Sequence, residues 1–337
     1  MTPPALGEFE IIARFFAPLA AGEAGALGLL DDAAVFAVPP GRSVVVSTDA
    51  IVESVHFLND DSGDDVAAKV LAVGFSDLAA MGSDALGYTL ALALPKDWGC
   101  EKLEQWLNGF ATGLGTEQQR IGVTLLGGDT VATPGPLTLS VTVLGTVETG
   151  RALTRAGAKP GDRVFVSGSI GDAALGLALL TGKLTAPGRA AHAALVNRYR
   201  RPTARLALGR RLTGLATAAC DVSDGLVADL GHICRASGVA ARIDAARIPV
   251  SAAAAEVLAA GAAKPSDLVE GGDDYELVFT VPPAQAATAQ GIGAALGIAV
   301  TDIGRIEQPA SQEDSVVRLL DAVGGDVTPS RIGYRHF

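Results

Sequence analysis

Apolar runs rich in valine and leucine alternate along the chain with alanine-rich segments of helical spacing, and glycine or proline separates them. The predicted helices are 8–16, 66–81, 173–180 and 224–237, and the predicted strands are 44–46, 89–94, 123–126, 137–147, 163–167 and 275–281. Strands that alternate with helices in this way are typical of an α/β protein.

A polar segment rich in turn formers, RALTRAGAKPGD, follows Gly150 and separates two such series of strands and helices. A chain of 337 residues with 49% hydrophobic residues can build two cores. We therefore predict an N-terminal domain at 1–149 and a C-terminal domain at 150–337.

No apolar run reaches the roughly 20 residues that a membrane span needs, and MTPPALGEFEII lacks the basic and apolar regions of a secretory signal. The prediction is a cytoplasmic protein that does not enter a membrane. The cysteines Cys100, Cys220 and Cys234 are odd in number and lack zinc-ligand spacing, which favours reduced thiols.

The net charge of −11 argues against nucleic acid as a partner, because lysine and arginine supply most of the affinity for a phosphate backbone. A small phosphorylated ligand is compatible with this charge. Divalent cations held by carboxylates can supply the positive charge that such a ligand needs.

Aspartates recur where apolar segments end or helices begin. They are Asp31 and Asp32 before AAVF, Asp49 after VVVST, Asp129 after LLGG, and Asp221 and Asp224 in CDVSDGL. Each alone is compatible with a helix cap or a solvated turn. Together, at strand ends that converge on one crevice, they predict an oxygen-ligand site suited to Mg²⁺. Asp77 differs, because it lies inside an apolar helical stretch and needs a partner.

Other candidates are less specific by themselves. The glycines of LLGGDT and SGSIGD permit close approach to a phosphate but also suit ordinary turns. Arg151 and Arg155 can bind phosphate oxygens or form surface ion pairs. His56 is compatible with a structural or a functional role.

Taken as a set, the motifs resemble those of one family. DDAAVF, VVVSTDAIVESVHF, AVGFSDLAAMGSD, LLGGDT, GRALTRAGAKPGD, YRRPTAR, DVSDGLVADLGHI and EGGDDYELVFT occur in the order found in the thiamine-monophosphate kinase family. The resemblance implies the two-domain α/β fold of the aminoimidazole-ribonucleotide-synthetase superfamily. In that fold the N-terminal domain dimerises through its sheet and the C-terminal domain closes over a cleft.

The resemblance also implies direct transfer of the γ-phosphoryl group of ATP to thiamine monophosphate with Mg²⁺, the last step of thiamine diphosphate biosynthesis, without a covalent or general-base residue. The implied metal ligands are Asp32, Ser47, Thr48, Asp49, Asp77, Asp129, Asp221 and Asp224. The implied ATP contacts are Gly128, Asp129, Arg155 and Ser223, and His56 and Asp273 lie on the thiamine phosphate side. Two polyphosphates can meet only if cations offset their repulsion, so the aspartates have a physical purpose.

The chain departs from the family pattern at Leu30, Gly74, Asp273 and Arg331. At Leu30, where relatives carry glycine, we expect a negative φ and a side chain packed on Phe36 or the first helix. Asp273 shortens a substrate-side glutamate by one methylene.

Two alternative functions are open. The first is another enzyme of the superfamily: an aminoimidazole-ribonucleotide synthetase, a selenophosphate synthetase or a hydrogenase-maturation dehydratase. The chain has no cysteine near its N-terminus for selenium chemistry, and its last residues are Arg335, His336 and Phe337 without the C-terminal cysteine of the dehydratase. A nucleotide sensor without activity would not need every metal-ligand position to hold aspartate, serine or threonine.

Overall fold

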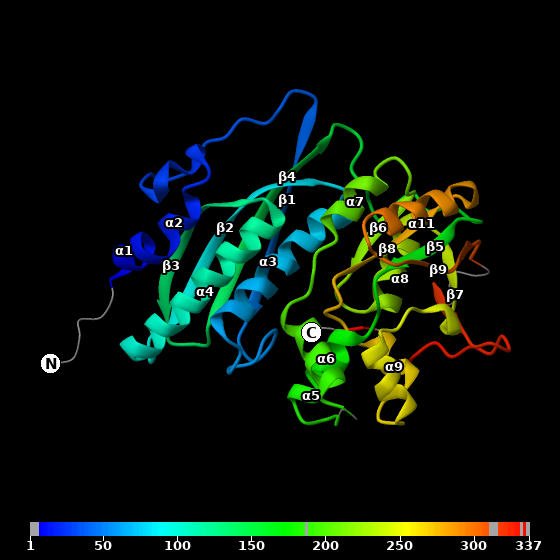
Figure 1. The fold of residues 1–337 in the computed structure, drawn as a ribbon. Coiled ribbons are helices and arrows are strands. Elements are labelled where there is room, and N and C mark those ends of the chain that lie inside the picture. Colours follow the sequence, from blue (N-terminus) through cyan, green and yellow to red (C-terminus); the bar gives the residue numbers. More distant parts are fainter. Residues whose placement is uncertain (1–6, 186–187, 310–315, 331–332, 335–337) are drawn as a thin grey trace. The chain divides into compact units, whose positions relative to one another are not determined.

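The computed structural model describes residues 7–185, 188–309, 316–330 and 333–334. The chain divides into two compact units, each built on its own sheet (Figure 1). The first unit contains Met1–Leu78 and Asp84–Gly150, and the second contains Ala79–Ser83 and Arg151–Phe337. Arg331 and the last three residues lie outside the described part of the chain.

The first unit is a four-stranded sheet with the strand order β1-β4-β2-β3. Its elements are α1 (Glu8–Ile11), the π-helical turn η1 (Ile12–Phe16), α2 (Ala17–Ala20), the 3-10 segment η2 (Ala24–Leu29), β1 (Arg42–Val52), α3 (Gly63–Ala80), β2 (Asp84–Pro95), α4 (Cys100–Ile121), β3 (Thr124–Thr133) and β4 (Thr138–Glu148). Strands β2 and β3 are parallel, and β4 pairs antiparallel with β1 and β2.

Helices α3 and α4 cover one face of this sheet (Figure 1). Tyr88 of β2 packs edge-on against Phe75 of α3, and its hydroxyl donates to Gln118 of α4 at 2.8 Å. A Cβ at Gly74 would lie 2.9 Å from Cγ1 of Val143 in β4. The glycine therefore lets α3 lie close to the sheet.

The second unit is a six-stranded sheet with the order β10-β7-β9-β5-β8-β6, in which only β10 and β7 pair in parallel. Its elements are β5 (Arg163–Ser167), α5 (Asp172–Leu180), α6 (Arg189–Arg200), α7 (Leu206–Leu212), β6 (Ala218–Val222), α8 (Leu226–Ser237), β7 (Ala240–Asp244), η3 (Ala245–Arg247), α9 (Ala252–Ala259), α10 (Pro265–Glu270), β8 (Glu276–Val281), η4 (Pro283–Gln285), α11 (Ala286–Ala295), β9 (Val300–Glu307) and β10 (Val317–Leu320). Helix α8 packs on one face of the sheet, and α7 and α11 pack on the other.

A fully buried carboxylate, Glu276 at the start of β8, is offset by Arg198 of α6 and by Arg205, the last residue of the YRRPTAR segment. Arg205 donates to both carboxylate oxygens, Arg198 donates to Oε1 at 3.1 Å, and Ser167 donates to Oε2 at 2.6 Å. Removing one partner of such a buried pair typically costs about 3–5 kcal/mol. This group therefore fixes α6 and the segment before α7 against the sheet.

The predicted helices and strands are all present, with others that were not predicted, such as α4 and β6, and strands β1, β2 and β3 extend further than the apolar runs indicated. Strand β1 continues through Ser47, Thr48 and Asp49, and β3 continues through Asp129 to Thr133. The prediction that these aspartates follow the ends of their strands is therefore wrong. Pairing with β4 and β2 keeps the polar residues extended. Among the described helices, none is both long enough and apolar enough to cross a bilayer.

The loop before Asp31 contains the left-handed residues Leu27 (φ 52°), Gly28 (φ 65°) and Leu29 (φ 58°). Leu30 has φ −105°, so its predicted negative φ is confirmed. The predicted packing of Leu30 is wrong, because its side chain is 91% exposed. The strain lies at the leucines on either side of Gly28.

Leu27→Gly should leave the free energy of unfolding unchanged or raise it by up to about 1 kcal/mol, because glycine relieves the left-handed strain. Leu30→Gly is the matched control, and should lower that free energy by about 0.5–1 kcal/mol through unfolded-state entropy. Urea denaturation of both variants measures the difference. A larger loss for Leu27→Gly than for Leu30→Gly would contradict the assignment of strain to Leu27.

Candidate functional site

Ser47, Asp49 and Asp77 come together where strand β1 lies against helix α3. Ser47 and Asp49 are two residues apart on β1, so their side chains leave the same face of the strand. The hydroxyl of Ser47 donates to Oδ2 of Asp77 on α3, and the charge of Asp77 acts on Asp49. The structure thus brings together three of the predicted metal ligands, one of them from a distant element.

The Asp49 carboxylate carries an electrostatic penalty. Burial, and then the like charge of Asp77, raise the pKa of Asp49 from 3.8 to about 6. Its Oδ2 atom is buried and has no hydrogen-bond partner among the described residues. A buried acceptor without a partner is costly, and two adjacent carboxylates suit a hard divalent cation. These residues therefore fit Mg²⁺.

Thr48 and Asp129 lie on the opposite face of the same sheet. Strand register places Thr48 beside Thr142, with the two hydroxyls 2.9 Å apart, and pairs Asp129 with Ala91. Thr48 and Asp129 are both exposed. Alternation along a strand separates these side chains from Ser47 and Asp49, so the aspartates of the first unit do not form a single cluster.

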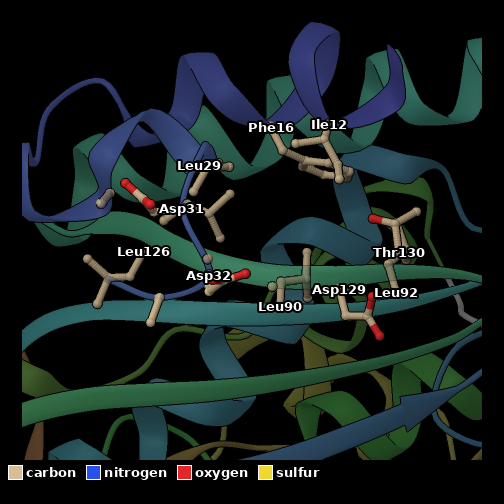
Figure 2. Close-up of a pocket in the computed structure, with 15 residues that line it drawn as sticks. Ile12, Phe16, Leu29, Asp31, Asp32, Leu90, Leu92, Leu126, Asp129 and Thr130 are labelled. Atoms are coloured by element: carbon tan, nitrogen blue, oxygen red, sulfur yellow. The ribbon is translucent and has the colours of Figure 1, made fainter. Parts of the chain in front are cut away.

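Asp31 and Asp32 lie in an exposed bend beside a recess of about 110 Å³ (Figure 2). Val35 donates its N–H to the carbonyl of Gly25 at 2.8 Å, and this contact returns the chain to η2. Figure 2 shows the carboxylate of Asp129 directed away from Asp32, although both residues line the recess. The rest of the recess is mainly apolar, with Ile12, Phe16, Leu29, Leu90, Leu92, Leu125 and Leu126 in its lining.

Gly128 and His56 each make a close backbone contact that accounts for the residue type at that position. A Cβ at Gly128 would lie 2.0 Å from the carbonyl oxygen of Leu90, so the neighbouring strand itself requires glycine there. Nδ1 of His56 accepts from the N–H of Val52 at 3.0 Å. The imidazole therefore carries its proton on Nε2 when neutral.

In the second unit, the segment from β6 to α8 wraps around Asp229. The N–H groups of Ser223, Asp224 and Gly225 each donate to Oδ2 of Asp229 at 3.0 Å. Burial, and then the charge of Asp221, raise the pKa of Asp229 to about 8. Asp229 therefore fixes the turn that presents the predicted residues Asp221, Ser223 and Asp224.

Arg155 supplies positive charge beside this turn. Burial lowers the pKa of Arg155, but Cys220, Asp221 and Asp229 outweigh that effect and raise it overall. The pKa of His232 on α8 is lowered, first by burial and then by Arg155. The guanidinium of Arg155 thus partly offsets the acidic group.

The GGDDY segment places Asp273 in a left-handed conformation, with φ 69°. The N–H of Asp273 donates to the carbonyl of Ser223 at 2.8 Å, and its Oδ1 accepts from the hydroxyl of Tyr275 at 3.0 Å. The next residue, Asp274, is fully buried, and burial raises its pKa well above the ordinary value. Its Oδ2 accepts from the N–H of Gly171 at 2.8 Å. Through the hydrogen bond from its N–H to Ser223, Asp273 is joined directly to the Asp221–Asp224 turn.

Sequence reasoning missed Asp229 and His232. Ligand atoms of Asp224, Asp229 and His232 lie within 4.8 Å of one another, a spacing that could hold a metal ion. In DGLVADLGH, Asp229 and His232 are three residues apart in α8 and so lie on the same side of the helix, while Asp224 is in the turn before it. The spacing D-x4-D-x2-H was the available signal. Clustered carboxylates, an arginine and glycine turns can together bind a phosphorylated ligand through cations.

Two family models match the chain, one in each unit. Residues 30–147 match the N-terminal domain of AIR synthase related proteins, and residues 159–316 match the C-terminal domain. With the two α/β sheets and their aspartates, these matches define a two-domain protein of the AIR synthase related class.

Similar curated proteins show which family within this class the chain belongs to. The thiamine-monophosphate kinase of Caulobacter vibrioides is 42% identical over 332 residues, which cover 98% of this chain and 90% of the relative. The chain belongs to the thiamine-monophosphate kinase family.

Solved structures agree with this assignment. A crystal structure of thiamine-monophosphate kinase from Stenotrophomonas maltophilia K279a has a TM-score of 0.77 and 41% identity, covering 86% of this chain and 89% of that one. The structure named AaThiL, complexed with AMPPCP and TMP, has a TM-score of 0.75 and 29% identity, covering 94% of this chain and 98% of that one. The superfamily fold expected from the motifs is confirmed.

Asp49→Asn should stabilise the metal-free protein at neutral pH. The pKa of Asp49 is higher in the folded state than in the unfolded state. The stability that its protonated form contributes is therefore fully present below pH 3.8 and is lost as the pH rises through about 6. Allowing for partial exposure, the variant should gain about 1–2 kcal/mol in unfolding free energy at pH 7.5 in EDTA and nothing at pH 3.5. Urea denaturation at both pH values measures this gain.

The matched control is Asp97→Asn, which neutralises an exposed carboxylate of the same unit. It should leave the unfolding free energy unchanged at both pH 7.5 and pH 3.5. Excess Mg²⁺ should stabilise wild type more than Asp49→Asn, because the variant loses a ligand. A loss of stability for Asp49→Asn in EDTA at pH 7.5 would show that the carboxylate has a structural partner.

Proposed function

We propose that this protein transfers the γ-phosphoryl group of ATP to thiamine monophosphate, forming thiamine diphosphate and ADP. The supporting observation is the facing pair Asp49 and Asp77, with its unpartnered buried oxygen, in a chain that matches thiamine-monophosphate kinases over 98% of its length. The AaThiL complex with AMPPCP and TMP supports a site for an ATP analogue and a second ligand in this family.

The cofactor is Mg²⁺, held at more than one position. Ser47, Asp49 and Asp77 form one group of ligands on the helix-covered face of the first sheet. Thr48 and Asp129 belong to a separate position, because strand alternation places them on the other face. The remaining ligands are Asp32, Asp221 and Asp224. When bound, Mg²⁺ would neutralise the charge between the triphosphate of ATP and the phosphate of thiamine monophosphate.

The protein's own groups mainly position the two phosphorylated molecules. Gly128, Asp129, Arg155 and Ser223 contact ATP, while His56 and Asp273 face the thiamine phosphate. A phosphate oxygen of the acceptor attacks the γ-phosphorus, and the bond to the β-phosphate oxygen breaks to leave ADP. The acceptor phosphate is already ionised at neutral pH, so no side chain has to remove a proton.

The protein acts in the cytoplasm as a homodimer formed by the first unit. Val44 and Val46 lie on the face of β1 opposite Asp49 and are 49% and 61% exposed. Val131 of β3, on the same face, is 50% exposed. An apolar sheet face of this kind suits a second copy of the chain, as the family resemblance implies.

Purified protein with ATP, Mg²⁺ and thiamine monophosphate should form thiamine diphosphate, detected by chromatography. Free thiamine should be a poor acceptor, because it lacks the nucleophilic phosphate. Asp77→Asn should lower kcat at least 100-fold, since lost charge stabilisation typically costs about 3 kcal/mol or more. Asp97→Asn should retain the wild-type rate. Equal turnover of free thiamine, or a near-normal kcat for Asp77→Asn, would overturn the assignment.

Val46→Glu should convert the dimer to monomers, because a charge would be buried in the proposed interface. Light scattering at micromolar concentration measures the mass. Val323→Glu, at an apolar position of the second unit that is 92% exposed, is the matched control and should stay dimeric. A wild-type monomer, or a Val46→Glu dimer, would contradict the interface.

A further inference from the structure

Four arginines lie in one row across neighbouring strands of the second sheet. Strand register pairs Arg318 of β10 with Arg242 of β7, Arg242 with Arg305 of β9, and Arg305 with Arg163 of β5. Residues paired directly across strands project from the same face, and neighbouring strands lie about 4.8 Å apart. The row thus places like charges side by side, which is unfavourable unless anions offset them.

The row lies on the face of the sheet opposite helix α8. The flanking residues Ala241, Ile243, Leu319 and Val164 all pack in the core with α8. Arg242 and Arg305, which alternate with these residues, are exposed. Arginines on this face are therefore accessible to a ligand and are not needed to fill the core.

Part of this face forms a recess of about 300 Å³. Its lining contains Arg163, Arg242, Arg247 and Arg305, with Asp244 and Asp321 as the acidic residues. Both carboxylates already serve local turns: Asp244 accepts from Ala246 N–H, and Asp321 accepts from the N–H groups of Val323 and Gly325. The lining therefore has an excess of cations, in a chain whose net charge is −11.

The chain offsets most, but not all, of these charges. Asp302 pairs with Arg163 at 2.6 Å and with Arg247 at 3.3 Å, and Glu307 pairs with Arg305 at 2.7 Å. Arg242, which lies between two other arginines, has no ion pair or hydrogen bond with the described part of the chain. An external anion would satisfy it.

We propose that this recess binds an oligophosphate, meaning an anion with two or more linked phosphoryl groups. Guanidinium forks bind phosphate oxygens in pairs, and adjacent forks suit adjacent phosphoryl groups. A recess of this volume suits a small ligand, and the acidic chain disfavours an extended polyanion. The site is separate from the residues assigned to phosphoryl transfer, and it does not depend on that proposed function.

Calorimetric titration of the whole protein with tripolyphosphate in EDTA tests the site. Without divalent cations the aspartates of the proposed kinase site repel phosphates, so saturable binding reports the arginine recess. Wild type should bind one equivalent per chain, and Arg242→Gln should weaken binding at least tenfold. The charge-matched control Arg211→Gln, which removes an exposed arginine of α7, should bind within twofold of wild type.

Pyrophosphate, ADP and thiamine diphosphate, titrated in the same way, identify the source of the phosphoryl groups. Tighter binding of one organic diphosphate, lost in Arg242→Gln, assigns the recess to that molecule. Equal binding of all three assigns it to the diphosphate group itself. Orthophosphate binding as tightly as tripolyphosphate would overturn the requirement for linked phosphoryl groups.

Other results would overturn the site itself. One is an absence of saturable tripolyphosphate binding by wild type. Another is that Arg242→Gln binds tripolyphosphate as tightly as wild type. A third is that Arg155→Gln loses binding while Arg242→Gln keeps it. The melting temperature of ligand-free Arg242→Gln should equal or exceed that of wild type, because a repulsive neighbour is removed. If that variant does not fold, Arg242→Lys, which keeps the charge but not the fork, should bind more weakly than wild type. Kinase turnover by Arg242→Gln should be normal, so failure of this site and failure of the proposed function are distinguishable.

Discussion

The sheet and helix of the first unit hold two carboxylates face to face at a half-buried position, and the candidate metal site depends on this constraint. Asp49 reaches this position from β1 and Asp77 from α3, and Ser47 holds Asp77 in place. Like charges in a partly desolvated site oppose folding, so the sheet and helix stabilise a geometry that the carboxylates alone would disfavour. Burial and the like charge of Asp77 are the physical reasons for the raised pKa of Asp49.

The second unit treats its buried charges in a different way. Glu276 is neutralised by Arg198 and Arg205 within the chain, and this compensated group has a structural role. Asp229 is held by three backbone N–H groups, which stabilise the turn that carries Asp221 and Asp224. Compensated charges of this kind belong to the scaffold, whereas the buried Oδ2 of Asp49, without a hydrogen-bond partner among the described residues, belongs to the candidate site.

Beta-sheet register decides which charges act together. A shift of one residue along a strand moves a side chain to the other face, so Ser47 and Thr48, although adjacent, belong to different groups. The same rule gathers Arg318, Arg242, Arg305 and Arg163 into one row, although they are distant in sequence. In both sheets the backbone pairing, rather than spacing in the sequence, selects the neighbours of each charge.

The sequence by itself determined the α/β class, four of the helical segments, the central residues of six strands and the family, because periodicity and ordered motifs are local properties. It also predicted the negative φ of Leu30, but not the left-handed conformation of Leu27 and Leu29 in the same loop. Only the tertiary structure decided that Asp49 faces Asp77 while Asp129 lies on the opposite face, and that Asp229 organises the turn before α8. It also decided that Leu30 is exposed. The facing of Asp49 and Asp77 depends on strand register and helix packing, which bring together residues that no sequence spacing relates.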